Sequence, residues 1–328
     1  MKNGFFSILS SAFLLVATVN MALAQQPLPA GGNPGGLVPG AGQPQAGFMP
    51  YPFAGPIGDA ELKHIDEVLT YWEYRSNKVV QYESVFKRWD YNSAFGPKSG
   101  DYYTYGEGQL KYAKPDKGLF KIENLRYYTA PVQPGAEATY VARAGDVLEH
   151  WVSNGKSIFQ FDSRKKQLIE NVLPPNQQGE AIASGPLPFL FGANKAKIKQ
   201  QFWLRAVTPS TVKNEYWLQA WPKLQQDAAE FKYIEIIIDQ KQFLPIAIQK
   251  FDRNYNPQAI PPNIDRTVYQ FDDINVREKG DLALVAQQVL QVFQRAFSDP
   301  AVPFGWQKVI NQPLQANNQN RPGGVVPR

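Results

Sequence analysis

Apolar and polar residues alternate through the middle of the chain, between Gly108 and Pro175, with the period of two that is typical of β-strands. The pattern breaks at Lys114-Pro115-Asp116, at Asn154-Gly155 and at Pro174-Pro175, where proline or a hairpin dipeptide ends a strand. It predicts consecutive antiparallel strands at Gly108–Tyr112, Leu119–Leu125, Glu149–Ser153, Ser157–Asp162 and Gln167–Val172. Within one of these strands, Phe159 and Phe161 share a face, and Ile158 and Gln160 share the other.

The same alternation appears before this stretch and again in the second half of the chain. It predicts further strands at Val79–Tyr91, Phe202–Val207, Glu215–Trp221, Phe231–Asp239, Leu244–Asp252 and Arg266–Asn275. A helical spacing of apolar residues predicts helices at Asp59–Ser76, Ala193–Gln200 and Leu282–Phe297. We therefore expect an α+β chain that consists mainly of antiparallel strands.

The N-terminal residues resemble a secretory signal peptide. Lys2 supplies the positive start, Phe5–Val19 is apolar, and Ala22-Leu23-Ala24 provides the small residues that a signal peptidase recognises. This pattern predicts cleavage after Ala24 and a periplasmic or secreted protein with no transmembrane segment after cleavage. An uncleaved N-terminal membrane anchor is the alternative, although serines interrupt the apolar run.

Both flanks of the predicted domain are low in complexity. Gln25–Pro56 is rich in glycine and proline and carries no charge, which predicts a disordered linker. A docking tail that uses Phe48, Tyr51 and Phe53 is the alternative interpretation of this segment. We expect the folded domain to span residues 57–310 and residues 311–328 to form a second disordered tail.

The amino-acid composition argues against several kinds of functional site. The 328 residues include no cysteine, so neither a disulfide nor a cysteine-ligated metal site can form. The net charge of +5 is spread along the chain without a basic run, which argues against nucleic-acid binding. The two histidines are isolated, and we expect no metal site, no cofactor and no enzyme activity. Ser153 and His150 would point to opposite faces of one strand, so they make a poor catalytic pair.

Several of these motifs occur together in the order found in one known family. Lys114-Pro115-Asp116, Val152-Ser153-Asn154-Gly155-Lys156 and Lys166-Gln167 resemble the strand and turn signals of the LolA/LolB-like periplasmic lipoprotein carriers. The resemblance implies a curved, incomplete (half) β-barrel wrapped around N- and C-terminal helices that pack on it. In these carriers an arginine after the Pro-Asp break helps to hold the empty state closed. Lys117-Gly118-Leu119-Phe120 contains no such arginine.

A curled sheet of this kind would leave an apolar groove on its inner face. Its aromatic and aliphatic residues predict binding of a lipid, an acyl chain or an acylated protein. The predicted lining consists of Trp89, Phe120, Ile122, Trp151, Phe159, Phe161, Leu218, Phe231, Tyr233 and Phe271. A short helical turn at Gly185–Gly192 is expected to plug into the concave side. The same lining residues could instead simply form the core beneath the helices.

The sequence favours two classes of function, with a hydrolase as a third and less favoured alternative. The first is an exported carrier of a lipid or acyl chain. The second is an envelope module that binds a protein partner, or senses one, through the same fold and without lipid transport.

Overall fold

The computed structural model describes residues 47–131, 133, 137–146, 148–175, 178, 193–278, 280 and 287–312. The predicted signal peptide, most of the predicted linker, the predicted turn at Gly185–Gly192 and nearly all of the predicted C-terminal tail lie outside these residues.

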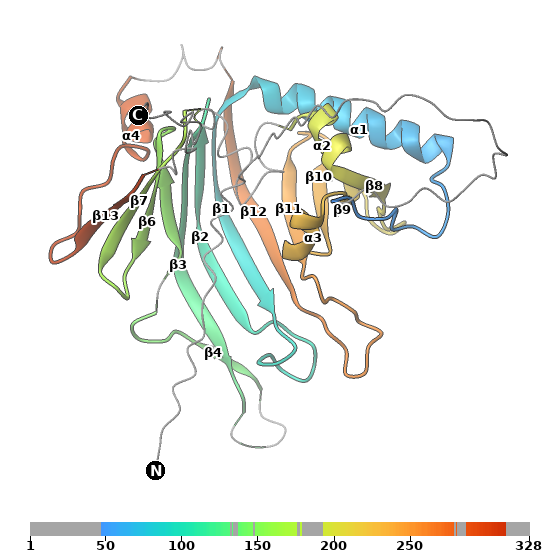
Figure 1. Ribbon diagram of the computed structural model, residues 1–328, viewed down its shortest axis with the longest axis horizontal. Coiled ribbons are helices and arrows are strands. Elements are labelled where there is room, and N and C mark those ends of the chain that lie inside the picture. The colour runs from blue at the N-terminus through green and yellow to red at the C-terminus, as the bar shows by residue number, and fades with distance from the viewer. Residues whose placement is uncertain are drawn as a thin grey trace, which may run out of the picture.

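One open, curved sheet dominates the fold (Figure 1), as the sequence predicts. Its strand order is β13-β7-β6-β5-β3-β2-β1-β12-β11-β10-β9-β8, and β4 pairs with β3 beside this path. Every pair is antiparallel except β13 with β7, which is parallel. The strands are β1 (Val79–Tyr91), β2 (Thr104–Ala113), β3 (Lys117–Thr129), β4 (Thr139–Val141), β5 (His150–Ser153), β6 (Ser157–Asp162), β7 (Gln167–Val172), β8 (Phe202–Ala206), β9 (Glu215–Pro222), β10 (Tyr233–Asp239), β11 (Pro245–Phe251), β12 (Arg266–Glu278) and β13 (Gln307–Asn311).

Side-chain alternation gives the sheet two distinct faces. Along β2 the buried Leu110 and Tyr112 lie on one side, and Lys111 between them lies on the other. We call the side that carries Leu110, together with its neighbours Phe86 and Phe120, the inner face, and the opposite side the outer face. Both faces carry large apolar residues, so both need a cover.

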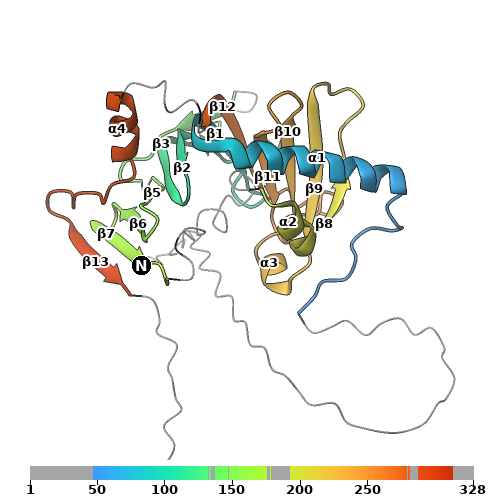
Figure 2. The same cartoon turned by 90° about the horizontal axis from the view of Figure 1, so that it is seen from above.

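Helix α1 (Asp59–Lys78) covers the inner face (Figure 1). Its residues Ile65, Val68, Leu69 and Trp72 are buried in the main core cluster, as their helical spacing predicts. The shorter helices α2 (Lys195–Gln201) and α3 (Gln225–Glu230) lie beside β8 and β9, near one edge of the sheet (Figure 2). Asn194 caps α2, because its side-chain oxygen accepts a hydrogen bond from the Lys197 amide.

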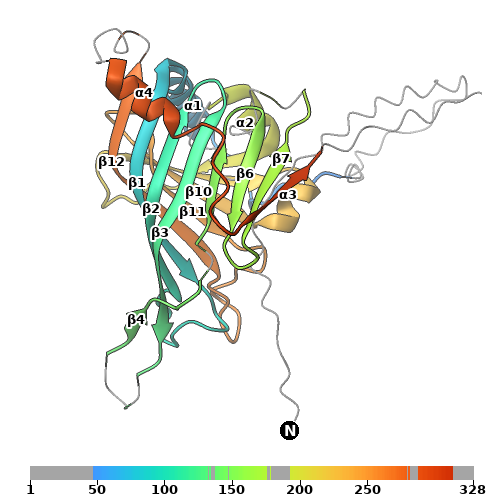
Figure 3. The ribbon, with the colours of Figure 1, turned by 90° about the vertical axis from the view of Figure 1, so that its left-hand side faces the viewer.

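Helix α4 (Gln287–Arg295) packs on the outer face instead (Figure 3). Phe293 and Phe297 contact Ala113 and Leu119, and these two positions alternate with the inner-face residues of β2 and β3. The predicted packing of N- and C-terminal helices on a curved, open sheet is confirmed, although α4 lies on the outer face and not inside the curve. Strand pairing decides which apolar side chains lie on each face of the sheet, and so which face a helix must cover. The apolar stripe of a helix predicts that it packs on a sheet, but it does not predict on which face.

The chain after α4 continues across the outer face and ends in β13, which the sequence did not predict. Asp299 accepts a hydrogen bond from the Asn154 amide, the Trp306 ring meets Phe161 edge-on, and Lys308 pairs with Glu170 at 2.7 Å. β13 has only Val309 and Ile310 as an apolar signal, too short to suggest a strand. Its backbone completes the sheet edge beside β7.

Gly108 of β2 lies where a neighbouring strand and an aromatic ring approach the backbone closely. A Cβ added there would meet the Lys121 carbonyl oxygen at 2.1 Å and the Phe86 ring at 2.6 Å. That ring stacks on Phe120 with 4.7 Å between centroids, and Phe120 stacks on Trp151 at 5.7 Å. The missing side chain at 108 thus permits the row of stacked rings on the inner face.

We expect Gly108→Ala to lower the free energy of unfolding by about 2–3 kcal/mol, because β3 or the Phe86 ring must move. Gly55→Ala is the matched control, since a Cβ there meets nothing within 4 Å, and its effect should stay within about 0.5 kcal/mol. Urea unfolding of both variants measures the difference. Equal stability of the two would contradict the close approach at Gly108.

Candidate functional site

The ten residues predicted to line one groove are divided between the two faces of the sheet. Six belong to the main inner-face core cluster: Phe120, Ile122, Trp151, Leu218, Phe231 and Phe271. Each of these keeps at most 9% of its surface accessible. They therefore pack as core residues in this structure, and ligand binding by them stays a prediction.

The other four residues lie on the outer face, because their cross-strand partners alternate with inner-face positions. Trp89 pairs with Tyr105 and Val268, whereas Phe86, three residues earlier, pairs with Gly108 and Phe271. The remaining three are Phe159, Phe161 and Tyr233.

The surroundings of these outer residues are aromatic. Phe159 is fully buried with Val152 and Leu168. The Phe161 ring stacks on His150 at 4.0 Å, and Tyr233 stacks between Trp221 and Phe251 at 4.6 and 4.2 Å. The predicted sharing of a face by Phe159 and Phe161 is confirmed, but no single groove contains all ten residues.

An apolar pocket of about 770 Å³ lies elsewhere, at the β8 edge of the sheet. The segment before α1, the first turns of α1, the end of α2 and β8 enclose it. Its lining is Tyr51, Phe53, Ala54, Gly55, Pro56, Ile57, Leu62, Ile65, Lys199, Phe202, Trp203, Leu204 and Lys223. This volume falls in the range of small-molecule sites, and apolar walls with few polar groups are typical of such sites.

The outer wall of this pocket is the chain segment 51–57, which the sequence placed mostly in the linker. The Met49 amide donates to the Lys223 carbonyl oxygen at 2.7 Å, and Phe48 forms an isolated bridge with Leu224. The Tyr51 ring meets Trp203 edge-on at 5.2 Å, and Phe53 meets Trp221 at 6.2 Å. The signal for this contact was the presence of aromatic residues in an uncharged Gly/Pro-rich stretch. Phe48, Tyr51 and Phe53, which make these contacts, are the residues named in the docking-tail alternative.

Leu62 shows why sequence reasoning missed the pocket. It shares the apolar stripe of α1 with Ile65, Leu69 and Trp72, which predicts a core position. In the structure it is 49% exposed and lines the pocket. The pocket draws its walls from four separate parts of the chain, and no local pattern joins them.

The polar rim of the pocket is positively charged. Lys223 Nζ donates to the Lys199 carbonyl oxygen at 2.6 Å and lies 4.1 Å from the Trp203 ring centroid. Lys199 pairs with Asp66 at 2.9 Å, and Lys195 pairs with the same carboxylate, which lowers the pKa of Asp66. Burial, together with the nearby Lys199 ammonium, lowers the pKa of Lys223.

A second cluster of charges lies on the inner face, around Arg88 of β1. Its guanidinium pairs with Asp90 and with Glu149, each at 3.1 Å. Asp90 also accepts hydrogen bonds from Thr104 of β2 and Thr267 of β12. The cluster thus ties neighbouring strands together with a guanidinium and two carboxylates, an arrangement that suits a structural role.

Glu149 in this cluster combines two properties. Its side chain keeps 41% of its surface accessible, yet the surrounding protein raises its pKa by desolvation. The Glu149 carboxylate is thus partly accessible to water and at the same time partly desolvated by the protein around it. No sequence motif announced the cluster, because Arg88 and Glu149 are 61 residues apart.

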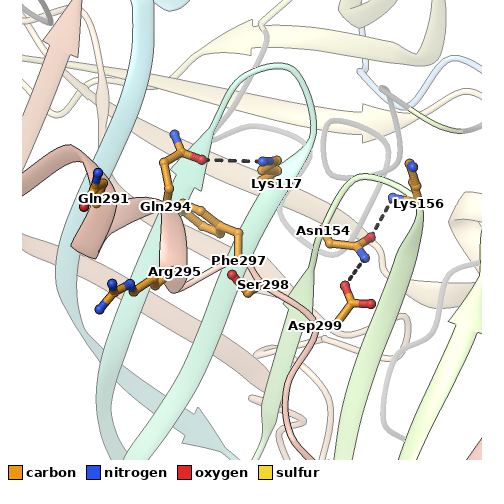
Figure 4. Close-up of a pocket in the computed structure, with 9 residues that line it drawn as sticks. All are labelled: Lys117, Asn154, Lys156, Gln291, Gln294, Arg295, Phe297, Ser298 and Asp299. Carbon is orange, nitrogen blue, oxygen red and sulfur yellow. Dashed lines mark hydrogen bonds between the residues drawn. The ribbon is translucent and has the colours of Figure 1, made fainter. Parts of the chain in front are cut away.

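A polar pocket of about 640 Å³ lies on the outer face between α4 and the turns before β3 and β6 (Figure 4). Lys117 Nζ donates to Gln294 at 3.4 Å, and Asn154 donates to Asp299. These bonds fix the end of α4 and the following segment against the strand turns. The pocket is open and has no apolar wall comparable to that at β8.

The histidine and the serine of β5 do not face each other in this structure. His150 and Ser153 lie on opposite faces of β5, as predicted, and the Ser153 hydroxyl donates to the Asp116 carbonyl oxygen at 3.1 Å. Across the described ranges, histidine and acidic residues nowhere gather in threes that could hold a metal ion. No helix within those ranges combines the length and apolar character needed to cross a membrane.

Comparison with known proteins adds an outline of the fold. No family model matches the chain, and neither does any curated protein. Among similar solved structures, an uncharacterized conserved protein from Thermus thermophilus has 9% identity and a TM-score of 0.39, covering 76% of this chain and 99% of its own. A LolA superfamily protein from Nitrosomonas europaea has 8% identity and a TM-score of 0.27, covering 67% of this chain and 98% of its own.

A third similar structure is a chain of the MucA/MucB complex from Pseudomonas aeruginosa. It has 12% identity and a TM-score of 0.30, covering 69% of this chain and 62% of its own. At these identities and scores the likeness concerns the outline of the fold and is silent on ligands and partners.

The stack of His150 on Phe161 makes stability depend on pH. Burial in the stack, with Lys121 across the ladder, lowers the pKa of His150 to about 4. An unfolded histidine titrates near pH 6.5, so below that pH the unfolded chain binds more protons at this site. The stabilisation is therefore complete above about pH 6.5 and is lost as the pH falls towards 4.

We expect unfolding free energies of the wild type to lose about 2–3 kcal/mol more than those of His150→Gln between pH 7 and pH 4. The carboxylates titrate in both proteins, so their contribution to the pH dependence of stability cancels when the two profiles are compared. Urea titrations at several pH values measure it. Parallel pH profiles of the two proteins would show that His150 is not held neutral.

Proposed function

We propose that this protein binds the acyl chain of a lipid in the apolar pocket at the β8 edge. The observation that carries this proposal is the pocket itself: about 770 Å³, walled by Leu62, Ile65, Phe202 and Leu204 and by the segment 51–57. Such a lining offers an acyl chain contact on several sides and offers a polar ligand few partners.

The energetics are sufficient for a carrier. Each buried methylene contributes about 0.8 kcal/mol, so ten methylenes contribute on the order of 8 kcal/mol before the costs of ordering and association. Association costs at least about 4 kcal/mol, so micromolar binding, which corresponds to about 8 kcal/mol, requires that about fifteen or more methylenes be buried. No polar chemistry is needed for affinity.

The cellular setting of the proposal comes from the sequence. The secretory signal pattern of Met1–Ala24 supports an exported protein, and the absence of cysteine fits a domain stabilised by its core alone. A lipid-binding protein outside the cytoplasm would carry or sense a lipid of the cell envelope.

A protein partner is the second candidate, and a different observation favours it. The segment after α4 exposes Val302 at 41%, Ile310 at 52% and Phe304 completely. Large apolar side chains exposed along one segment offer a surface that a protein partner could bury. This surface is separate from the β8 pocket, so the two functions need not exclude each other.

The pocket proposal is tested with an uncharged acyl probe. We expect Leu62→Asp to weaken binding of a fluorescent monoacylglycerol at least tenfold, because it places a carboxylate against the chain. Val292→Asp is the matched control: it also replaces an exposed aliphatic residue of a helix, 66% accessible, but on α4. Its affinity should equal that of the wild type.

Loss of binding in both variants, or in neither, would contradict the assignment of the pocket. Thermal unfolding shows whether either variant is destabilised. Native mass spectrometry of protein purified from its own envelope should reveal bound lipid. A clean apoprotein that fails to bind the probe would end the lipid-binding proposal and favour the partner-binding alternative.

A further inference from the structure

The polar groups that face the β8 pocket are almost all hydrogen-bond donors. Lys199 and Lys223 contribute ammonium groups, and the side chain of Trp203 also lines the pocket. Tyr51 adds a hydroxyl, which donates to the Gly55 carbonyl oxygen at 3.2 Å. Among the described residues, the lining contains no aspartate or glutamate. A ligand in this pocket would therefore find donors and positive charge, and no carboxylate to repel an anion.

The charge of this region is not balanced by the protein nearby. Lys195 and Lys199 share the single carboxylate of Asp66, with Lys199 at 2.9 Å. No carboxylate of the described residues lies within ion-pair distance of Lys223. Lys195 also has the carboxylate of Glu73 nearby, which accepts a hydrogen bond from the Lys195 backbone amide at 3.3 Å. Among the described lysines of this rim, Lys223 therefore has no carboxylate to neutralise it.

Lys223 also has a structural contact, which must be weighed against a ligand role. Its ammonium donates to the Lys199 carbonyl oxygen in the last turn of α2, as lysines near helix C-termini commonly do. This bond uses one of the three N–H groups of the ammonium. The other two remain for an acceptor in the pocket. Burial, together with the nearby Lys199 ammonium, lowers the pKa of Lys223, so an anion beside it would favour its charged form.

The indole of Trp203 lies next to the Lys223 ammonium. Its Nε1–H is buried and has no hydrogen-bond acceptor among the described residues. A buried donor without an acceptor destabilises a folded protein, so native structures seldom leave one unsatisfied. Trp203 lines the pocket, and the Lys223 ammonium lies against its ring. Because the buried Nε1 does not open into the pocket, the observation that points to an anion is the ammonium of Lys223, which no carboxylate of the described residues neutralises.

We propose that the pocket selects anionic amphiphiles, with Lys223 as the main contact to a carboxylate or phosphate headgroup and Lys199 as the second. The acyl chain then lies against Leu62, Ile65 and Leu204, and the headgroup lies at the lysine rim. This inference rests on the proposed function, because it assigns the headgroup of the same ligand.

The experiment compares three ligands of equal chain length with the full-length protein: a fatty acid, a lysophosphatidic acid and an uncharged monoacylglycerol. We expect the wild type to bind at least one of the two anions about tenfold more tightly than the monoacylglycerol, and this preference should shrink as the salt concentration rises. Preference for the fatty acid identifies a carboxylate site, and preference for the lysophosphatidic acid identifies a phosphate site.

Variants then locate the charge. Lys223→Gln should remove most of the preference for the anion, because it should weaken binding of the anion far more than binding of the monoacylglycerol. Lys223→Arg should retain the preference, because the positive charge remains. Lys63→Gln is the matched control, since its side chain is 80% accessible on the same helix as Leu62 and lies outside the pocket lining.

The outcomes separate this inference from the proposed function. Equal binding of all three ligands, or a preference that survives Lys223→Gln, would overturn the headgroup assignment and leave acyl binding in place. Failure of the wild type to bind any of the three would overturn both. Thermal unfolding of Lys223→Gln shows whether the lost contact to the Lys199 carbonyl destabilises the fold, and retained monoacylglycerol binding shows that the pocket is intact.

Discussion

Side chains on adjacent positions of a strand point to opposite sides, and this alternation places a constraint on the whole molecule. The strands carry large apolar residues on both sides, so one open sheet has two faces that must be shielded from water. α1 shields the inner face, and α4 with the segment up to β13 shields part of the outer face. The β8 edge is covered by neither helix alone, and the segment before α1 closes it only partly. The pocket is the space that remains.

This division explains why the aromatic residues do not form one continuous binding surface. The rings of Phe86, Phe120 and Trp151 stack in a row on the inner face, supported by the close approach at Gly108. Those of Trp221, Tyr233 and Phe251 stack on the outer face. Rings that stack on each other bury each other's apolar surface and so stabilise the sheet. The pocket lies apart from both rows, and its aliphatic, aromatic and lysine side chains come from the β8 edge of the sheet and the segment before α1.

Much of the fold was predictable from the sequence because its signals are local. Asn154-Gly155 fixes the β5–β6 turn, and period-2 runs place most strands to within a few residues. β13 was not predicted, since its partner β7 lies far away in sequence and pairing supplies most of its stability. The face of each residue also depends on register: two irregularities in the β1–β12 ladder shift it locally. Predicting that Trp89 and Phe120 share a lining therefore needed information that no single strand contains.

The site depends on still more distant combinations. Tyr51, Leu62, Trp203 and Lys223 come from four parts of the chain and meet only after the sheet has formed. The most direct test of this account is a crystal structure of the protein with a fatty acid brominated at mid-chain, located by anomalous scattering. The account predicts bromine between the segment 51–57, α1 and β8, with the carboxylate end towards Lys223. Bromine against Trp151 on the inner face, or beside Phe161 on the outer face, would contradict it.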